Sequence, residues 1–176
     1  MTETQMFYAR FGSNIVALLM VFACWRWRTV GRWMFVLLFA WAAQMNLRTA
    51  ITRPDVYLEY APLAYSEAYR HFILGYFARH ITAIVGTIAI GQLLIAILIS
   101  LRGRAVRLGL TGAIVFLVAI IPLGIGSGFP ATPIMALAAG LLLRSPCERT
   151  LWSGTWQWIT TRHSHELSTI DPHTHA

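Results

Sequence analysis

The sequence is poor in charged residues and contains no lysine at all. Only 12% of its 176 residues are charged and 57% are hydrophobic, whereas soluble domains carry about 25% charged residues. The surface of a soluble helical domain of this length would need more charge than this chain has. The composition therefore argues against a soluble domain and favours one compact membrane domain.

Cysteine and catalytic signatures are equally scarce. The two cysteines, Cys24 and Cys147, form no CxxC pair, and the chain contains no GxSxG, HExxH or phosphate-binding loop. No Asp or Glu lies within an apolar run, where a proton or ion pathway normally places one. These absences argue against thiol chemistry, those hydrolase classes and an ion-coupled transporter. Nucleic acid is not an expected partner either, because no basic stripe lies on a soluble domain.

What the chain has instead is a series of long apolar runs. Ile81 to Leu101 carries no formal charge and is long enough to cross a hydrocarbon core of about 30 Å. The runs predict an all-α, polytopic membrane bundle of four to five transmembrane helices within residues 1–148. The expected spans are about 8–25, 33–50, 78–101, 108–125 and 131–143, and the helix of the third is expected to begin near Glu67. The first span is the weakest, because Arg10 and Asn14 lie inside it.

Arginine clusters between the runs predict the orientation. They are Arg26, Arg28 and Arg32, then Arg102, Arg104 and Arg107, then Arg144 and the residues after it. Basic residues concentrate on the cytoplasmic side of membrane proteins. The C-terminus is therefore expected inside, the N-terminus outside if all five segments cross, and the connection 52–70 on the extracytoplasmic side.

The residues after the last span predict two further segments. Trp152, Trp156 and Ile159 recur at helical spacing between flanking arginines, which is typical of an amphipathic helix on the membrane surface. We expect this cytoplasmic helix at 149–162 and a disordered tail at 163–176. The tail carries His163, His165, His173 and His175. HxH pairs can bind Zn²⁺ or Ni²⁺, but without a fixed scaffold we expect a weakly metal-binding tail and assign no metal site there.

The predicted extracytoplasmic end collects most of the polar side chains that could bind a ligand. The candidate pocket residues are Arg48, Arg53, Tyr57, Tyr69, Arg70, Tyr76, Arg79 and His80. Arginines would hold an anionic or carbonyl group, and an aromatic stripe of Tyr65, Tyr69, Phe72, Tyr76 and His80 would hold a flat or lipidic body. The alternative is an interfacial tyrosine belt, with ion pairs between Arg48, Arg53 or Arg70 and the acids Asp55, Glu59 and Glu67.

Small residues and an amide inside the third span favour packing over transport. Gly86 and Gly91 are small enough to let helices approach, and the nearby Gln92 amide can form a hydrogen bond to another helix. The glycine- and proline-rich break from Pro122 to Pro130 ends the fourth span. It is either a re-entrant turn that lines a cavity or simply an outer turn. It is expected on the same side as the aromatic residues, where it could form a wall of the same pocket.

The order of several short motifs resembles the DoxX-like group of small bacterial membrane proteins. These motifs are Asn46-Leu47-Arg48, Pro54 with Tyr57, Tyr69-Arg70, Gly91-Gln92-Leu93-Leu94, Arg102-Gly103-Arg104, and Pro122-Leu123-Gly124 with Phe129-Pro130. The resemblance covers about residues 33 to 144. It implies a four-helix membrane bundle in a bacterial cytoplasmic (inner) membrane and a link to quinone-dependent sulfur or thiol redox systems. It transfers no catalytic residue.

Three functions are compatible with these observations. The leading hypothesis is a non-catalytic accessory subunit or anchor of a larger membrane complex, with membrane lipid and a protein partner or further copies of the chain as its contacts. The second is a quinone- or lipid-binding component of a membrane oxidoreductase that uses the extracytoplasmic pocket. The third is a small-molecule transporter, which the missing acids disfavour.

Overall fold

Helices make up almost all of the described chain. The computed structural model describes residues 3–64, 66–123, 129–144 and 150–151, with side chains from residue 11 onward. No strand occurs among these residues, so the all-α prediction is confirmed. The long helices are α1 (Glu3–Arg26), α2 (Arg28–Thr52), α4 (Ile81–Ser100), α5 (Arg104–Ala119) and α6 (Ala131–Leu143).

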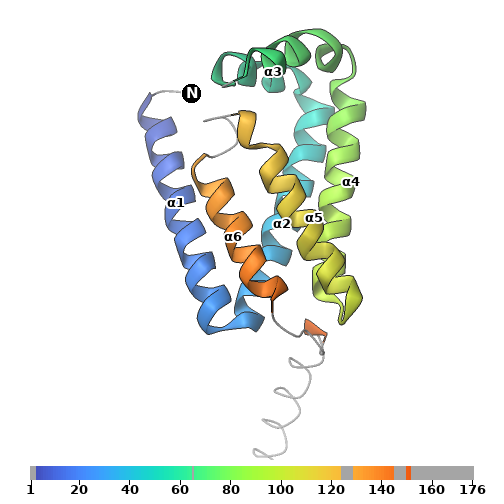
Figure 1. The fold of residues 1–176 in the computed structure, drawn as a ribbon. Helices are drawn as coiled ribbons and strands as arrows, with labels where there is room; N and C mark the ends of the chain where they lie inside the picture. Colours follow the sequence, from blue (N-terminus) through green and yellow to red (C-terminus); the bar gives the residue numbers. More distant parts are fainter. Residues whose placement is uncertain (1–2, 65, 124–128, 145–149, 152–176) are drawn as a thin grey trace, which may run out of the picture.

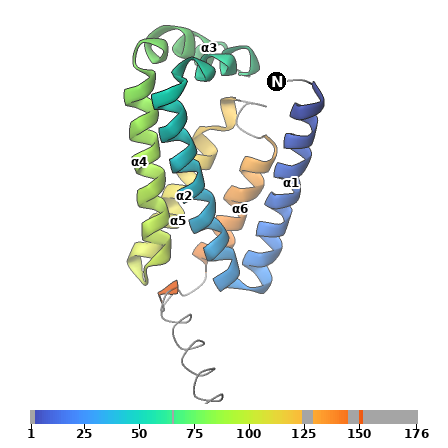
Figure 2. The same cartoon turned by 180° about the vertical axis from the view of Figure 1, so that it is seen from behind.

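The long helices stand side by side, and successive ones run in opposite directions (Figure 1). α2 packs on α4, α4 on α5, α5 on α6, and α6 on α1. α1 and α2 meet at the turn that joins them and diverge towards their other ends (Figure 2). The bundle is therefore a ring of helices that is closed least tightly between α1 and α2.

Tight turns join the helices at one end of the bundle, which we call the arginine end. Trp27 alone separates α1 from α2, and Leu101 to Gly103 separate α4 from α5. Gly103 has a φ of 62°, a conformation that glycine adopts without the steric cost a side chain would bring. Because α2 begins at Arg28 and not at residue 33 as predicted, Arg32 lies inside the helix.

Short helices lie across the other end, which we call the capped end (Figure 1). They are the 3-10 helix η1 (Pro54–Leu63), α3 (Glu67–Phe72) and the π-helical turn η2 (Ile73–Phe77). The expected helix from Glu67 into the third span is wrong, because the chain breaks at His80 (φ −133°, ψ 24°) before α4 begins. This break turns residues 67–79 across the bundle.

Two separate hydrophobic clusters form the core. The larger one extends along the bundle from the arginine end and includes Phe35, Phe39, Ile99, Leu110 and Leu142. The smaller one, at the capped end, consists of Ala50, Ala61, Ile73, Phe77, Ile81 and Val85. The two clusters are therefore not continuous with each other in the half of the bundle next to the capped end.

Glycine sets two close helix contacts. A Cβ added to Gly31 would lie 2.6 Å from Cys24 Sγ, and one added to Gly109 would lie 2.9 Å from the Ile99 main-chain nitrogen. By contrast, a Cβ at Gly86 or Gly91 would have no atom within 4 Å. The prediction that Gly86 and Gly91 let helices approach is therefore wrong, and Gly31 and Gly109 have this role.

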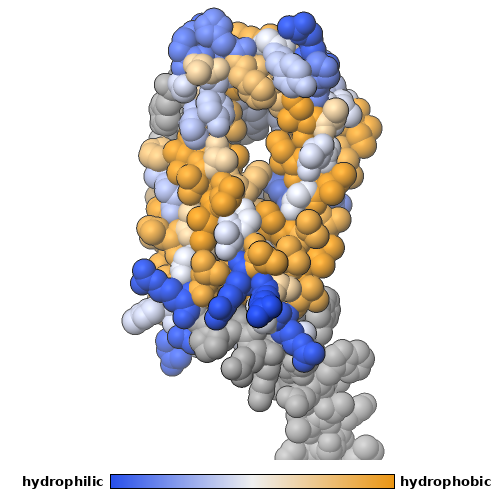
Figure 3. All heavy atoms as spheres, turned by 45° about the vertical axis from the view of Figure 1, so that its right-hand side comes forward, coloured by the Kyte–Doolittle hydropathy of each residue, from blue (hydrophilic) through white to orange (hydrophobic). Residues whose placement is uncertain are grey.

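Apolar side chains cover much of the outer surface. Leu18, Leu37, Ile90, Leu108 and Leu137, one on each long helix, are at least 60% exposed. Figure 3 shows that these apolar atoms occupy the middle of the molecule and that hydrophilic residues gather at its two ends. By length and composition, α2, α4 and the stretch Arg104–Leu123 could each cross a membrane, whereas Phe11–Arg26 and α6 are shorter apolar helices.

Candidate functional site: an apolar cavity beneath the capped end

A cavity of about 630 Å³ lies between the two hydrophobic clusters. Every long helix and all three short helices contribute to its wall. The lining residues are Ser13, Leu38, Phe39, Trp41, Ala42, Asn46, Tyr57, Tyr60, Tyr69, Phe72, Ile73, Phe77, Ile84, Val85, Ile88, Gln92, Phe116, Leu117, Ala119, Ile120, Leu123, Ala131, Thr132 and Met135. Its volume is in the range of small-molecule sites, about 300–1,000 Å³. The space-filling view shows an opening below the capped end, so the bundle is hollowed in this half (Figure 3).

The wall is mainly apolar and aromatic, and its polar groups are uncharged. Among the described residues that line the cavity, none is Asp, Glu, Arg, His or Cys. No group of three or more His, Cys, Asp or Glu that could hold a metal ion occurs in the described part of the chain. The lining therefore suits the binding of a neutral, lipophilic molecule.

A line of hydrogen bonds crosses the wall from the short helices to α4. The Tyr57 hydroxyl donates to Asn46 Oδ1 at 3.1 Å and lies 3.2 Å from the Asn46 carbonyl oxygen. Asn46 Nδ2 donates to Gln92 Oε1 at 2.9 Å. The prediction that the Gln92 amide bonds to another helix is thus confirmed, and its partner is on α2.

Tyrosines close the cavity at the capped end. Tyr69 donates to the Ala119 carbonyl oxygen at 3.1 Å, which ties α3 to the end of α5. Burial raises the pKa of Tyr57, with a smaller contribution from the neighbouring Tyr60. Burial also raises the pKa of Tyr60, with a smaller contribution from Glu59. Because both values lie above the ordinary value of about 10, both hydroxyls remain neutral at physiological pH.

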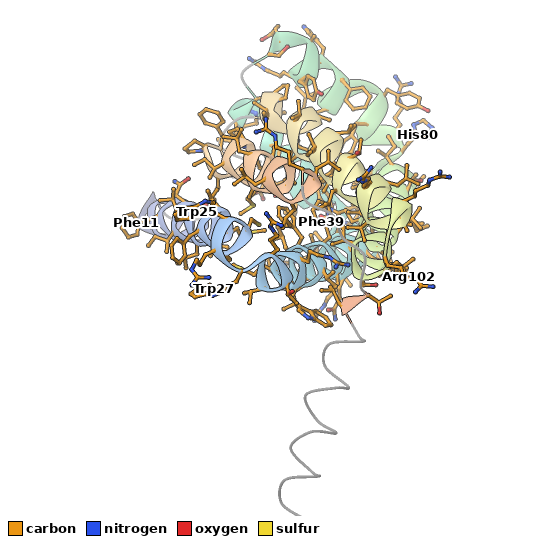
Figure 4. The ribbon with its side chains drawn as sticks, turned by 60° about the horizontal axis from the view of Figure 1, so that its bottom comes forward. Phe11, Trp25, Trp27, Phe39, His80 and Arg102 are labelled. Carbon is orange, nitrogen blue, oxygen red and sulfur yellow. The ribbon has the colours of Figure 1, made fainter. Side chains whose placement is uncertain are left out.

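Two of the eight predicted pocket residues line this cavity, Tyr57 and Tyr69. The other six are exposed and outside its lining: Arg48, Arg53, Arg70, Tyr76, Arg79 and His80. The predicted aromatic stripe divides accordingly. Phe72 joins the wall, whereas the Tyr76 and His80 rings stack on each other at 4.5 Å outside it. Figure 4 shows His80 at the edge of the molecule, far from Phe39 in the interior.

The predicted ion pairs form in part. Glu67 lies 3.6 Å from Arg70 and 3.6 Å from His71, and all three side chains are more than half exposed. Pairs this exposed contribute at most about 1 kcal/mol. Arg48 and Arg53 form no ion pair within the described residues. The stripe residue Tyr65 lies outside them.

Polar residues inside the apolar helices form the part of the site that the sequence prediction missed. Ser13, Asn46, Gln92 and Thr132 all line the cavity. Thr132 is 5% exposed, and its Oγ1 has no hydrogen-bond partner in the described part of the chain. Polar residues at membrane depth are rare and mark functional sites, so Asn46 and Gln92 carried the signal that could have located this cavity.

The break between α5 and α6 borders the same cavity. Leu123 precedes residues 124–128, which the structure does not describe, and Ala131 and Thr132 follow the Phe129–Pro130 turn. Of the region predicted as a pocket wall, Pro122 to Pro130, Leu123 lines this cavity. The predicted helix at 149–162 and tail at 163–176 lie outside the described residues, apart from Thr150 and Leu151.

Comparison with known proteins adds no assignment. No known protein family, curated protein or solved structure is significantly similar to this chain. The resemblance to the DoxX-like group therefore stays a prediction from the motifs quoted above.

Proposed function

We propose that this chain is an integral membrane protein that binds a lipophilic molecule of the quinone or lipid class in the cavity. The observation that carries this proposal is an apolar space of about 630 Å³ whose described lining has neutral hydrogen-bonding groups and no charge. Such a lining positions a neutral molecule by shape and hydrogen bonds. Apart from tyrosines, the described lining has no side chain that serves as a general acid or base, so a binding subunit fits better than an enzyme that acts alone.

The distribution of exposed side chains supports the membrane location. Soluble monomers rarely expose an apolar surface of this extent, and the apolar band lies between two hydrophilic ends (Figure 3). In the proposed arrangement all five long helices cross a bacterial inner membrane. The arginine end and the C-terminus face the cytoplasm, because Arg26, Arg28, Arg102, Arg104 and Arg107 are exposed at that end.

The accessory-subunit hypothesis remains part of the proposal. A small bundle that holds a lipophilic molecule without catalytic groups would supply or position that molecule for a protein partner in the same membrane. The exposed apolar faces of the helices would contact both lipid and such a partner.

The test is mild detergent extraction followed by native mass spectrometry of the protein with everything bound to it. We expect about one lipophilic molecule per chain. Ala42→Phe places a ring at the cavity wall and should remove the molecule. Ala83→Phe, at an exposed position of α4 outside the lining, should retain it. Equal amounts of bound molecule in both folded variants, or none in the unmodified protein, would contradict the proposal.

A further inference from the structure

The hydrogen bonds in the cavity wall follow one direction. Tyr57 donates to Asn46, and Asn46 Nδ2 donates to Gln92 Oε1. The acceptor oxygens of both amides are therefore used within the protein. The last group in the line, Gln92 Nε2, forms no hydrogen bond within the described residues.

Gln92 lies in the cavity wall, and its unpartnered Nε2 is not among the fully buried polar atoms of the described residues. Its side chain is only 3% exposed, and the cavity that it lines is also bordered by Ile88 on the same helix and Phe39 on α2. A polar N–H removed from water destabilises a protein unless it finds an acceptor. A ligand that covers Gln92 Nε2 is therefore expected to supply an acceptor for it.

The described wall has no charged side chain that could pair with a charged ligand. The described lining holds no arginine, histidine, glutamate or aspartate, and the predicted pocket arginines are exposed elsewhere. Burying an anion without a counter-charge is far more costly than burying a neutral carbonyl group. The wall thus favours a neutral head group that accepts hydrogen bonds.

We infer that the ligand, within the function proposed above, is a neutral lipid whose head carries a carbonyl oxygen that accepts a hydrogen bond from Gln92 Nε2. The remainder of the head lies against the aromatic wall of Phe39 and Phe116, and the apolar tail leaves through the open side of the bundle. Anionic lipids are disfavoured because the described lining has no cation to pair with them. Tyr57 and Asn46 are positioning residues that hold the Gln92 amide in place.

The experiment uses three probes with one chain length: a long-chain methyl ketone, the corresponding alkane and the corresponding fatty-acid anion. Each is titrated calorimetrically into the full chain in nanodiscs of zwitterionic phospholipid. We expect Gln92→Leu to weaken ketone binding about fivefold to tenfold, the usual effect of one neutral hydrogen bond. Alkane binding should change by less than about twofold, because the alkane accepts no hydrogen bond.

Controls separate this inference from loss of fold and from failure of the proposed function. Gln44→Leu, at an exposed position outside the lining, should leave ketone binding unchanged. Tyr57→Phe keeps Gln92 and removes only the first donor of the line, so it should weaken ketone binding less than Gln92→Leu does. It therefore serves as the second variant if Gln92→Leu does not fold.

The outcomes are distinct. Preferential binding of the anion, or equal effects of Gln92→Leu on ketone and alkane, would overturn the inference and leave a lipophilic cavity in place. If none of the three probes binds the unmodified protein, the proposed function itself fails.

Discussion

At the residue scale, Arg32 illustrates how burial changes the role of a charge. Its Nη2 lies 2.9 Å from the Ile99 carbonyl oxygen and 2.6 Å from the Leu101 carbonyl oxygen. Ile99 lies in the last turn of α4 and Leu101 directly follows the helix, where carbonyl acceptors have no partner within the helix. A cation also interacts favourably with the negative end of the helix dipole. Arg32 therefore joins the beginning of α2 to the end of α4.

Replacing Arg32 should destabilise the fold at this junction. We expect Arg32→Ala to lower the free energy of unfolding by about 2–4 kcal/mol, since buried carbonyl groups lose a charged donor. The measurement is unfolding in detergent, monitored by circular dichroism. Arg28→Ala, at an exposed position of the same helix, should change stability by less than about 0.5 kcal/mol. Similar losses in both variants would contradict this role.

Individual residues also show what could and could not be predicted from the sequence. Arg32 is one of three arginines in a short segment, and only the register of α2 distinguishes the buried one from the exposed pair. Tyr57 and Tyr69, which line the cavity, were candidates because aromatic residues gather in the connection between the second and third spans. The arginine candidates failed to line the cavity because long side chains at helix ends reach water. From the sequence, Gln92 was assigned a role in helix packing only. Its hydrogen bond to Asn46 joins positions 46 residues apart, and the sequence does not show that the two meet in one wall.

At the element scale, the close contacts of α1 with α2 and of α4 with α5 require glycine. We expect Gly31→Ala and Gly109→Ala each to lower the free energy of unfolding by about 1–3 kcal/mol, because the added methyl group meets main-chain atoms that cannot move away. Gly86→Ala, where the methyl group meets open space, should be neutral or slightly stabilising. Thermal unfolding of the three variants in one detergent is the measurement. Loss of stability in Gly86→Ala equal to that in Gly31→Ala would contradict the assignment.

Element boundaries explain most of the remaining differences between prediction and structure. The apolar runs located the long helices, and residues 131–143 were predicted with the observed bounds of α6. The cap was expected to be a polar connection, because Arg53, Pro54 and Asp55 suggest a loop. It is helical because Pro54 fits the first position of a helix, where no N–H is needed. The helix breaks at His80 although no glycine or proline lies next to it, so the sequence alone could not place this break.

At the scale of the whole molecule, the two ends carry different charges. The described acids with placed side chains, Asp55, Glu59 and Glu67, belong to the capped end, whereas the described charged side chains of the arginine end are all arginines. This asymmetry predicts that the capped end is extracytoplasmic. In a background without Cys24 and Cys147, a membrane-impermeant maleimide should label Glu59→Cys in intact cells and Arg104→Cys only after lysis. The reverse pattern would show the opposite orientation.

The central claim is that the space beneath the capped end holds a lipophilic molecule, and an experimental map of the natively extracted protein in a lipid nanodisc tests it most directly. We predict elongated density in the cavity, with its head within hydrogen-bonding distance of Gln92 and its tail directed to the side of the bundle. A cavity that is empty, filled with ordered water or closed by its own side chains would contradict the claim.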